Sequence, residues 1–174
     1  MNRKEYSRHY EDTVGVRANP EKVFSYADDI RNLSSHMSQS SWMMGGGSMK
    51  TEVDDGKGQK VGSHIKMSGT VFGVNLFLDE VIVEHEPPFH KAWETVGDVN
   101  LLVIDQYKLG FEITPDDNVS NLRVYIDYDL PKSWKTKLIG RMFGGTYAKW
   151  CVNQMLNGTQ NHFKSKVPLG ILHS

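Results

Sequence analysis

The stretch that decides the fold of this 174-residue chain is Leu122-Arg-Val-Tyr-Ile-Asp-Tyr-Asp-Leu130, which leads through Pro131 into a long helical segment. Its even positions are all apolar or aromatic, an alternation typical of a half-buried strand. After Pro131 the period changes to that of a helix. The positions of its predicted apolar stripe are Ala148, Cys151, Val152, Met155, Thr159 and Phe163. We therefore predict a sheet that ends in one long helix docked on its concave face.

Glycines interrupt the approach to this helix at positions 140, 144 and 145. Glycine weakens a helix interior because its backbone is conformationally free. The sequence therefore predicts a shorter helix from about Ser133 to Met142, then a break, and then the main helix from about Thr146.

Upstream, the pattern from Tyr6 to Val16 indicates a first strand. Asn19 can cap a following helix and Pro20 suits its first turn. A second short helix is predicted around Ile30 to Met37, with Asp28 or Asp29 as its cap. Two short helices are thus expected after the first strand.

From Met49 onward, apolar runs separated by turn residues have the rhythm of an antiparallel meander. Asp55-Gly56-Lys57-Gly58 and Pro87-Pro88 are two of these turns. Together with the first strand this gives about seven strands. The remaining six are expected near residues 48–54, 60–71, 74–84, 89–96, 101–113 and 122–130. No repeat or linker divides the chain, so the pattern predicts one α+β domain over residues 1–174 with a curved antiparallel sheet.

Alternation also assigns side chains to the inner face of each strand. The third strand is expected to point Val61, Ile65, Met67 and Val71 inward, the fourth Phe77, Val81 and Val83, and the fifth Phe89, Trp93 and Thr95. The sixth strand is expected to point its odd positions inward, Leu101, Val103, Asp105, Tyr107, Leu109, Phe111 and Ile113. Asp105 would then be a carboxylate on an apolar face, which is costly without a partner.

Composition excludes several classes of protein. Hydrophobic residues make up 39% of the chain, charged residues 24%, and the formal net charge is −1, so nothing indicates a nucleic-acid partner or a stable membrane insertion. Cys151 is the single cysteine, so no intramolecular disulfide can form. Together with an N-terminus that lacks a signal-peptide core, this favours a cytoplasmic location.

Several local strings carry a family resemblance. They are Ala18-Asn-Pro-Glu-Lys-Val-Phe24 with Asp28-Asp29, Glu80-Val-Ile-Val-Glu-His-Glu-Pro87 with Trp93-Glu94, and Tyr147-Ala-Lys-Trp-Cys151. With the order of elements, they resemble the polyketide cyclase/dehydrase and lipid-transport group of the START/Bet v 1-like (SRPBCC) superfamily. The resemblance covers nearly the whole chain. It implies a helix-grip fold, in which a sheet of about seven strands grips a long C-terminal helix over an apolar cavity.

This fold hosts many functions, so three hypotheses stay open. The first is the binding, transport or sequestration of a small hydrophobic ligand such as a lipid, polyketide or aromatic compound. Its predicted lining is Met67, Phe77, Trp93, Tyr107, Phe111, Tyr128, Cys151 and Met155. The second is a cyclase/dehydratase-type enzyme in which Asp105 and Tyr107 act as acid and base. The third is a protein-interaction module with a filled core, whose partner the sequence does not identify.

Other motifs carry less information. The seven histidines have no metal-ligand spacing, and Gly45-Gly46-Gly47 lacks the Lys-Ser/Thr of a phosphate loop, so neither a metal nor a cofactor is expected. Trp42, Met43 and Met44 could gate a cavity or fill a core. The cations from Lys132 to Arg141, interleaved with Trp134, Leu138 and Ile139, could rest on an anionic membrane or form a solvated helix face.

Overall fold

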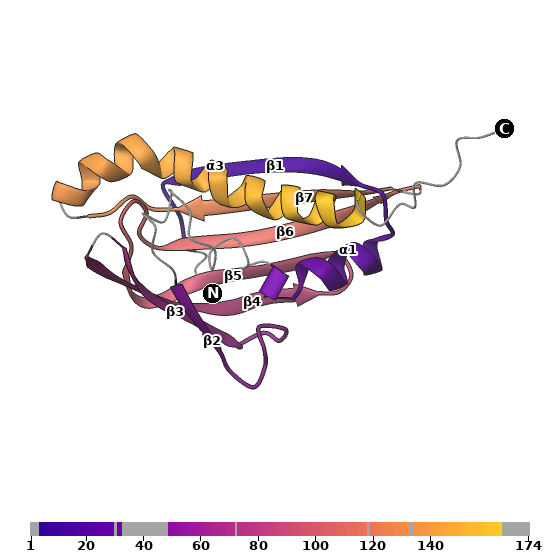
Figure 1. The fold of residues 1–174 in the computed structure, drawn as a ribbon, viewed down its shortest axis with the longest axis horizontal. Helices are drawn as coiled ribbons and strands as arrows, with labels where there is room; N and C mark the ends of the chain where they lie inside the picture. The colour runs from indigo at the N-terminus through magenta and orange to yellow at the C-terminus, as the bar shows by residue number, and fades with distance from the viewer. Residues whose placement is uncertain are drawn as a thin grey trace.

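The computed structural model describes residues 4–29, 31–32, 49–71, 73–117, 119–132 and 134–164. These residues form one antiparallel sheet with helices packed against it (Figure 1). The elements are β1 (Arg8–Val16), α1 (Pro20–Ala27), β2 (Met49–Val53), β3 (His64–Val71), β4 (Val74–Glu86), β5 (His90–Asn100), β6 (Tyr107–Asp116), β7 (Val119–Tyr128) and α3 (Trp134–Lys164).

The seven strands are ordered β1-β7-β6-β5-β4-β3-β2, so β1 lies at one edge of the sheet and pairs with β7, the last strand in the sequence. Arg8 lies opposite Tyr128 and Val16 opposite Ser120 in the β1–β7 register. α3 lies against β1 and β7 on one face of the curved sheet, and α1 lies near the C-terminal part of α3 (Figure 1). The helix-grip fold predicted from the sequence is confirmed.

The start of α1 follows the local rules that predicted it. Asn19 is the N-cap, and its side chain accepts a hydrogen bond from the Lys22 amide at 3.2 Å, while Pro20 occupies the first turn. Val23, Phe24 and Ala27 are buried. Of the predicted second helix, Arg31 and Asn32 are helical, and the rest lies outside the described residues, as do Trp42, Met43, Met44 and the triple glycine.

The predicted break in the C-terminal helix is wrong, because α3 is continuous over 31 residues. A Cβ atom at Gly140 would lie 2.6 Å from Cδ of Pro131 and 3.0 Å from the carbonyl oxygen of Val103. At Gly144 it would lie 3.1 Å from the same oxygen. These glycines therefore allow the helix to approach the connection between β5 and β6 closely. Among the described residues, no helix is both long enough and apolar enough to cross a bilayer.

The predicted inner faces of β6 and β7 agree with the buried side chains, and those of β5 and β3 agree in part. Tyr107, Phe111 and Ile113 of β6 are buried, as are the even positions of β7 and the residues Trp93 and Thr95 of β5. Ile65 and Met67 of β3 are also buried. The apolar stripe of α3 contributes Ala148, Cys151, Val152, Met155 and Thr159 to the same interior.

The inner face predicted for β4 is wrong. Its even positions Leu76, Leu78, Glu80 and Ile82 are buried, whereas Phe77 is 45% exposed on the opposite face. Both parities of this strand carry apolar side chains, so alternation alone does not identify the inner one. Phe89 and Val61, also predicted to point inward, are 49% and 63% exposed. Both lie just outside the ladders, where strand alternation no longer applies.

The predicted sixth strand begins too early. β6 starts at Tyr107, and residues 101–106 form the connection from β5. Ile104 is nevertheless 2% exposed, because the connection folds its apolar side chains onto the core. Apolar residues of a loop that pack on the core can thus give the same sequence pattern as a strand. The Asp105 amide donates to the carbonyl oxygen of Asp129 at 2.9 Å, which fixes this connection to the end of β7.

Candidate functional site

The candidate site is built around Glu80, whose carboxyl group lies in the interior between the sheet and α3. Glu80 is on the buried face of β4, between Leu78 and Ile82, and is 2% exposed. Transfer of a carboxyl group from water to such a place is costly unless polar partners compensate for the lost hydration. The hydrogen-bond partners of Glu80 therefore decide how far its carboxyl group is stabilised in the interior.

Two side chains, one from the adjacent strand β5 and one from β6 beyond it, donate hydrogen bonds to one oxygen of Glu80. The indole nitrogen of Trp93 on β5 lies 3.1 Å from Oε1, and the hydroxyl of Tyr107 on β6 donates to the same atom. The other oxygen, Oε2, is fully buried and has no hydrogen-bond partner in the part of the chain that the structure describes. A carboxyl group has acceptor capacity on both oxygens, so half of this group is unsatisfied.

The surroundings change the acidity of Glu80. Burial raises its pKa to about 7, because desolvation penalises the carboxylate, while the hydrogen bonds from Tyr107 and Trp93 lower it in part. Near neutral pH both the acid and the carboxylate are therefore populated. A group with this acidity inside a protein can exchange a proton with a bound molecule.

Tyr107 and Cys151 remain protonated near Glu80. Burial raises the pKa of Tyr107 well above its usual value, and the negative charge of Glu80 raises it further. Burial also raises the pKa of the Cys151 thiol to about 12, against a smaller opposing effect of its hydrogen bond with Tyr147. A thiol of this acidity is a poor nucleophile, so Cys151 contributes apolar surface here.

A second buried polar cluster joins this site to α1. Lys91 on β5 is 1% exposed, and its Nζ lies 2.6 Å from Oδ1 and 3.1 Å from the carbonyl oxygen of Asp28, the C-cap of α1. Nε2 of His85 lies 3.1 Å from the same Oδ1. The Lys91 ammonium is also 5.9 Å from the centre of the Trp93 ring and lowers the pKa of Glu80. This pair anchors α1 beside the wall of the site.

Asp105, the acid predicted from the sequence, lies elsewhere. It precedes β6, its side chain is 20% exposed, and its Oδ2 is 3.9 Å from Nζ of Lys132. Its predicted position on an inner strand face is therefore wrong. Tyr107, the other predicted catalytic residue, is buried as expected, but the acid that it contacts is Glu80.

Most of the predicted lining shares the interior with Glu80. Seven of the eight residues are at most 8% exposed, namely Met67, Trp93, Tyr107, Phe111, Tyr128, Cys151 and Met155. Phe77, the eighth, lies on the outer face of β4. Burial is compatible both with walls around a ligand and with a filled core, so a contact of these seven residues with a ligand stays a prediction.

Glu80 itself was missed as a site residue. In the sequence Glu80 stands within a string that carries the family resemblance, and alternation predicts that the odd positions of its strand face inward. A signal was present, because Leu76, Leu78 and Ile82 form an apolar set of the opposite parity. An inner carboxyl group is an exception to that set, and such exceptions often mark functional positions.

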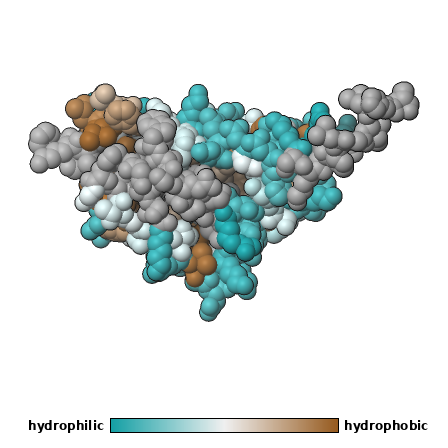
Figure 2. All heavy atoms as spheres, viewed as in Figure 1, coloured by the Kyte–Doolittle hydropathy of each residue, from teal (hydrophilic) through white to brown (hydrophobic). Residues whose placement is uncertain are grey.

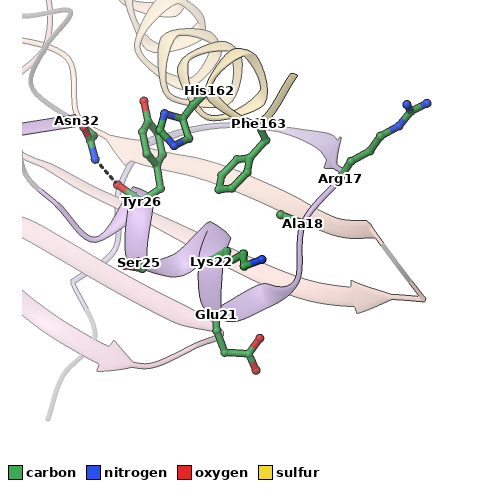
Figure 3. A pocket seen from close by; sticks show the side chains of 9 residues that line it. All are labelled: Arg17, Ala18, Glu21, Lys22, Ser25, Tyr26, Asn32, His162 and Phe163. Atoms are coloured by element: carbon green, nitrogen blue, oxygen red, sulfur yellow. Dashed lines mark hydrogen bonds between the residues drawn. The ribbon is translucent and has the colours of Figure 1, made fainter. Parts of the chain in front are cut away.

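A groove of about 710 Å³ lies between α1 and the C-terminal end of α3 (Figure 3). Tyr26 faces His162, with ring centres 4.0 Å apart and an angle of 30° between the rings. Charges of both signs, Lys22 and Glu21 among them, surround it. The aromatic rings that line this groove pack on each other, and this contact joins α1 to α3. We therefore take the surroundings of Glu80, and not this groove, as the candidate ligand site.

Solved structures share this architecture at low sequence identity. The Zhui aromatase/cyclase from Streptomyces sp. R1128 aligns with a TM-score of 0.68 and 14% identity, covering 93% of this chain and 96% of that one. Ara h 8.0201 aligns with a TM-score of 0.61 and 12% identity, covering 91% of this chain and 99% of that one. A conserved protein from Geobacillus kaustophilus aligns with a TM-score of 0.61 and 17% identity, covering 91% of this chain and 96% of that one. No curated protein sequence matches the chain.

The fold is therefore the helix-grip fold of START/Bet v 1-like proteins, with the carboxyl group of Glu80 buried beside apolar and aromatic side chains. The model of one family within this class matches residues 7–155. The chain belongs to the polyketide cyclase/dehydrase and lipid transport family. The resemblance found in the sequence is thus confirmed.

Proposed function

We propose that this protein binds a small, mainly apolar molecule between the sheet and α3, and that Glu80 orients it through Oε2. The observation that carries this proposal is the unequal use of the two carboxyl oxygens, since Oε1 accepts two hydrogen bonds and Oε2 none among the described residues. A hydroxyl or N–H group of a ligand would satisfy Oε2. The ligand class is then an apolar compound with one hydrogen-bond donor, such as a phenol or an alcohol.

The remaining walls suit such a molecule. Around Glu80 the inner face of the sheet and the stripe of α3 supply apolar and aromatic side chains. Burial of apolar area stabilises a complex by about 25 cal/mol per Å², so the walls would provide affinity while one polar group provides orientation. The family description, which names polyketide cyclases and lipid transport, agrees with ligands of this kind.

A second function, proton transfer on the bound molecule, is favoured by the contact between Glu80 and Tyr107. With a pKa of about 7, Glu80 can accept a proton from a ligand and return it. Tyr107 and Trp93 would hold the carboxyl group in one orientation and stabilise its anion. In a cyclase or dehydratase Glu80 would thus be the acid and base, and Tyr107 a positioning residue.

Two matched probes test the proposed binding, naphthol and its methyl ether, which differ by one hydrogen-bond donor. We expect the protein to bind naphthol about tenfold more tightly, because only naphthol can donate to Oε2. Dissociation constants would be measured by fluorescence titration. Equal affinities, or binding of neither probe, would contradict the proposal.

The variant Glu80→Gln sharpens this test, because its amide can direct an N–H group to the position of Oε2. We expect the preference for naphthol to disappear in this variant. Glu86→Gln, at the exposed end of the same strand, is the matched control and should retain the preference. Native mass spectrometry of protein purified from its own host, followed by organic extraction, would then identify the natural ligand.

A further inference from the structure

The first turns of α3 expose four large apolar side chains on one face. Leu138 is 65% exposed, Ile139 45%, Met142 65% and Phe143 50%. Their spacing of one, four and five residues places them on adjacent positions of a single helix face. We call these four residues the apolar patch. Figure 2 shows hydrophobic residues gathered at the upper left, where Figure 1 places the start of α3.

This face points away from the rest of the protein because the opposite face is fixed by close packing. Gly140 and Gly144 lie against Pro131, Leu130 and the carbonyl oxygen of Val103. Further along α3, the outward face is polar, with Thr146, Lys149 and Asn157 exposed. The apolar patch is therefore a local property of the first turns and not a general feature of the helix.

The stretch of sequence that carries the apolar patch contains no acidic residue, and the acid that the structure places beside it is Asp105, 3.9 Å from Lys132. All 21 acidic residues of the chain lie within residues 1–130, while residues 131–174 contain seven of the 20 lysines and arginines and no acidic residue. Arg141 lies within the patch segment and is exposed, and Lys132 just before α3 has a side chain 87% exposed. A chain with a net charge of −1 thus concentrates positive charge beside exposed apolar groups.

We propose that the apolar patch docks the protein on an anionic lipid bilayer. Apolar side chains flanked by cations are the combination that binds helices to the interface of such a bilayer, since the side chains enter the acyl boundary and the cations contact acidic headgroups. A second copy of this chain fits less well, because a symmetric contact would bring the same cations together. The proposal does not depend on the ligand of Glu80.

Sedimentation with vesicles tests this proposal. We expect the protein to pellet with vesicles of phosphatidylcholine and phosphatidylserine, to remain in solution with phosphatidylcholine alone, and to be released by salt, which screens the cations. The double variant Leu138→Ser/Met142→Ser should lose about tenfold or more in vesicle affinity. Because both side chains are exposed, its circular dichroism and unfolding midpoint should stay those of the wild type.

Phe77→Ser is the matched control, since Phe77 is a similarly exposed apolar residue on the outer face of β4. Its vesicle affinity should be unchanged. Absence of binding to the acidic vesicles, or equal loss in the double variant and the control, would overturn the proposal. So would a dimer in solution that the double variant dissociates, because the patch would then be the contact between two copies.

Discussion

The indole N–H of Trp93 donates to Oε1 of Glu80 across 3.1 Å, and both side chains are buried on the inner face of the sheet. Since Tyr107 donates to the same oxygen, both protein donors converge on one side of the carboxyl group. The other oxygen, Oε2, has no hydrogen-bond partner among the described residues, and it is the atom that orients the ligand in the proposed function.

Replacing Glu80 by Gln should change how stability depends on pH. The folded pKa of Glu80, about 7, is higher than the ordinary value of 4.5, so the folded protein holds a proton that the unfolded chain releases between these values. The contribution of Glu80 to stability is thus fully present below pH 4.5 and is lost as the pH rises to about 7. Glutamine cannot lose this proton, so the variant should gain about 3 kcal/mol over the wild type across this window.

Urea unfolding of both proteins from about pH 5 to about pH 8 measures this gain. The difference between the two proteins isolates Glu80, because all other titrating groups are shared. A constant difference over the whole range would show that Glu80 has an ordinary pKa in the folded state.

Tyr107→Phe should raise the pKa of Glu80 further. The hydroxyl of Tyr107 stabilises the carboxylate, so its loss leaves Oε1 with Trp93 as its remaining donor among the described residues. We also expect a loss of about 1 to 3 kcal/mol of stability, greater at high pH than at low pH. The infrared carbonyl band of the protonated acid, followed against pH, measures the shift. Tyr125→Phe, on the other face of the sheet, should leave the titration unmoved.

Removing either member of the buried pair of Lys91 and Asp28 should lower the stability of the protein, but by unequal amounts. Asp28→Asn removes the anion that neutralises a 1% exposed ammonium group and should cost about 3 to 5 kcal/mol. Lys91→Met should cost less, because Asp28 keeps a contact with His85 and an apolar side chain replaces the buried charge. Urea midpoints of both single variants and the double variant test this order. A greater loss in Lys91→Met would contradict it.

Two glycines of α3 should respond oppositely to alanine. At Gly140 a Cβ atom would meet Pro131 at 2.6 Å and backbone at 3.0 Å, so Gly140→Ala should destabilise the protein by about 1 to 3 kcal/mol. At Gly158 nothing lies within 4 Å, so Gly158→Ala should stabilise by up to about 1 kcal/mol through helix propensity. Thermal unfolding of the two variants measures the contrast, and equal shifts would mean that Gly140 is not a close-packing position.

The thiol of Cys151 should be unreactive in the folded protein. Burial raises its pKa to about 12, so almost no thiolate is present near neutral pH. Ellman's reagent should therefore react with the thiol only when denaturant unfolds the chain. Rapid reaction of the native protein would show that the interior around Cys151 opens readily.

How much of this could be predicted from the sequence differs from strand to strand. In β7 the even positions from Leu122 to Tyr128 are apolar or aromatic and most odd positions are charged or polar, so its inner face was predicted correctly. In β4 both parities contain large apolar residues, and the inner set includes Glu80. Burial of that side chain depends on donors from β5 and β6, which local periodicity does not encode.

The sequence by itself determined the order of the elements, the cap and first turn of α1, the alternation of β6 and β7 and the apolar stripe of α3, because these follow from the local geometry of strands and helices. Only the tertiary structure decided that α3 is unbroken at its glycines and that Glu80 lies in the interior with one satisfied oxygen. The physical reason is that close packing and the hydration of a carboxyl group depend on atoms far apart in the chain, such as Gly140 beside Val103 and Glu80 beside Tyr107.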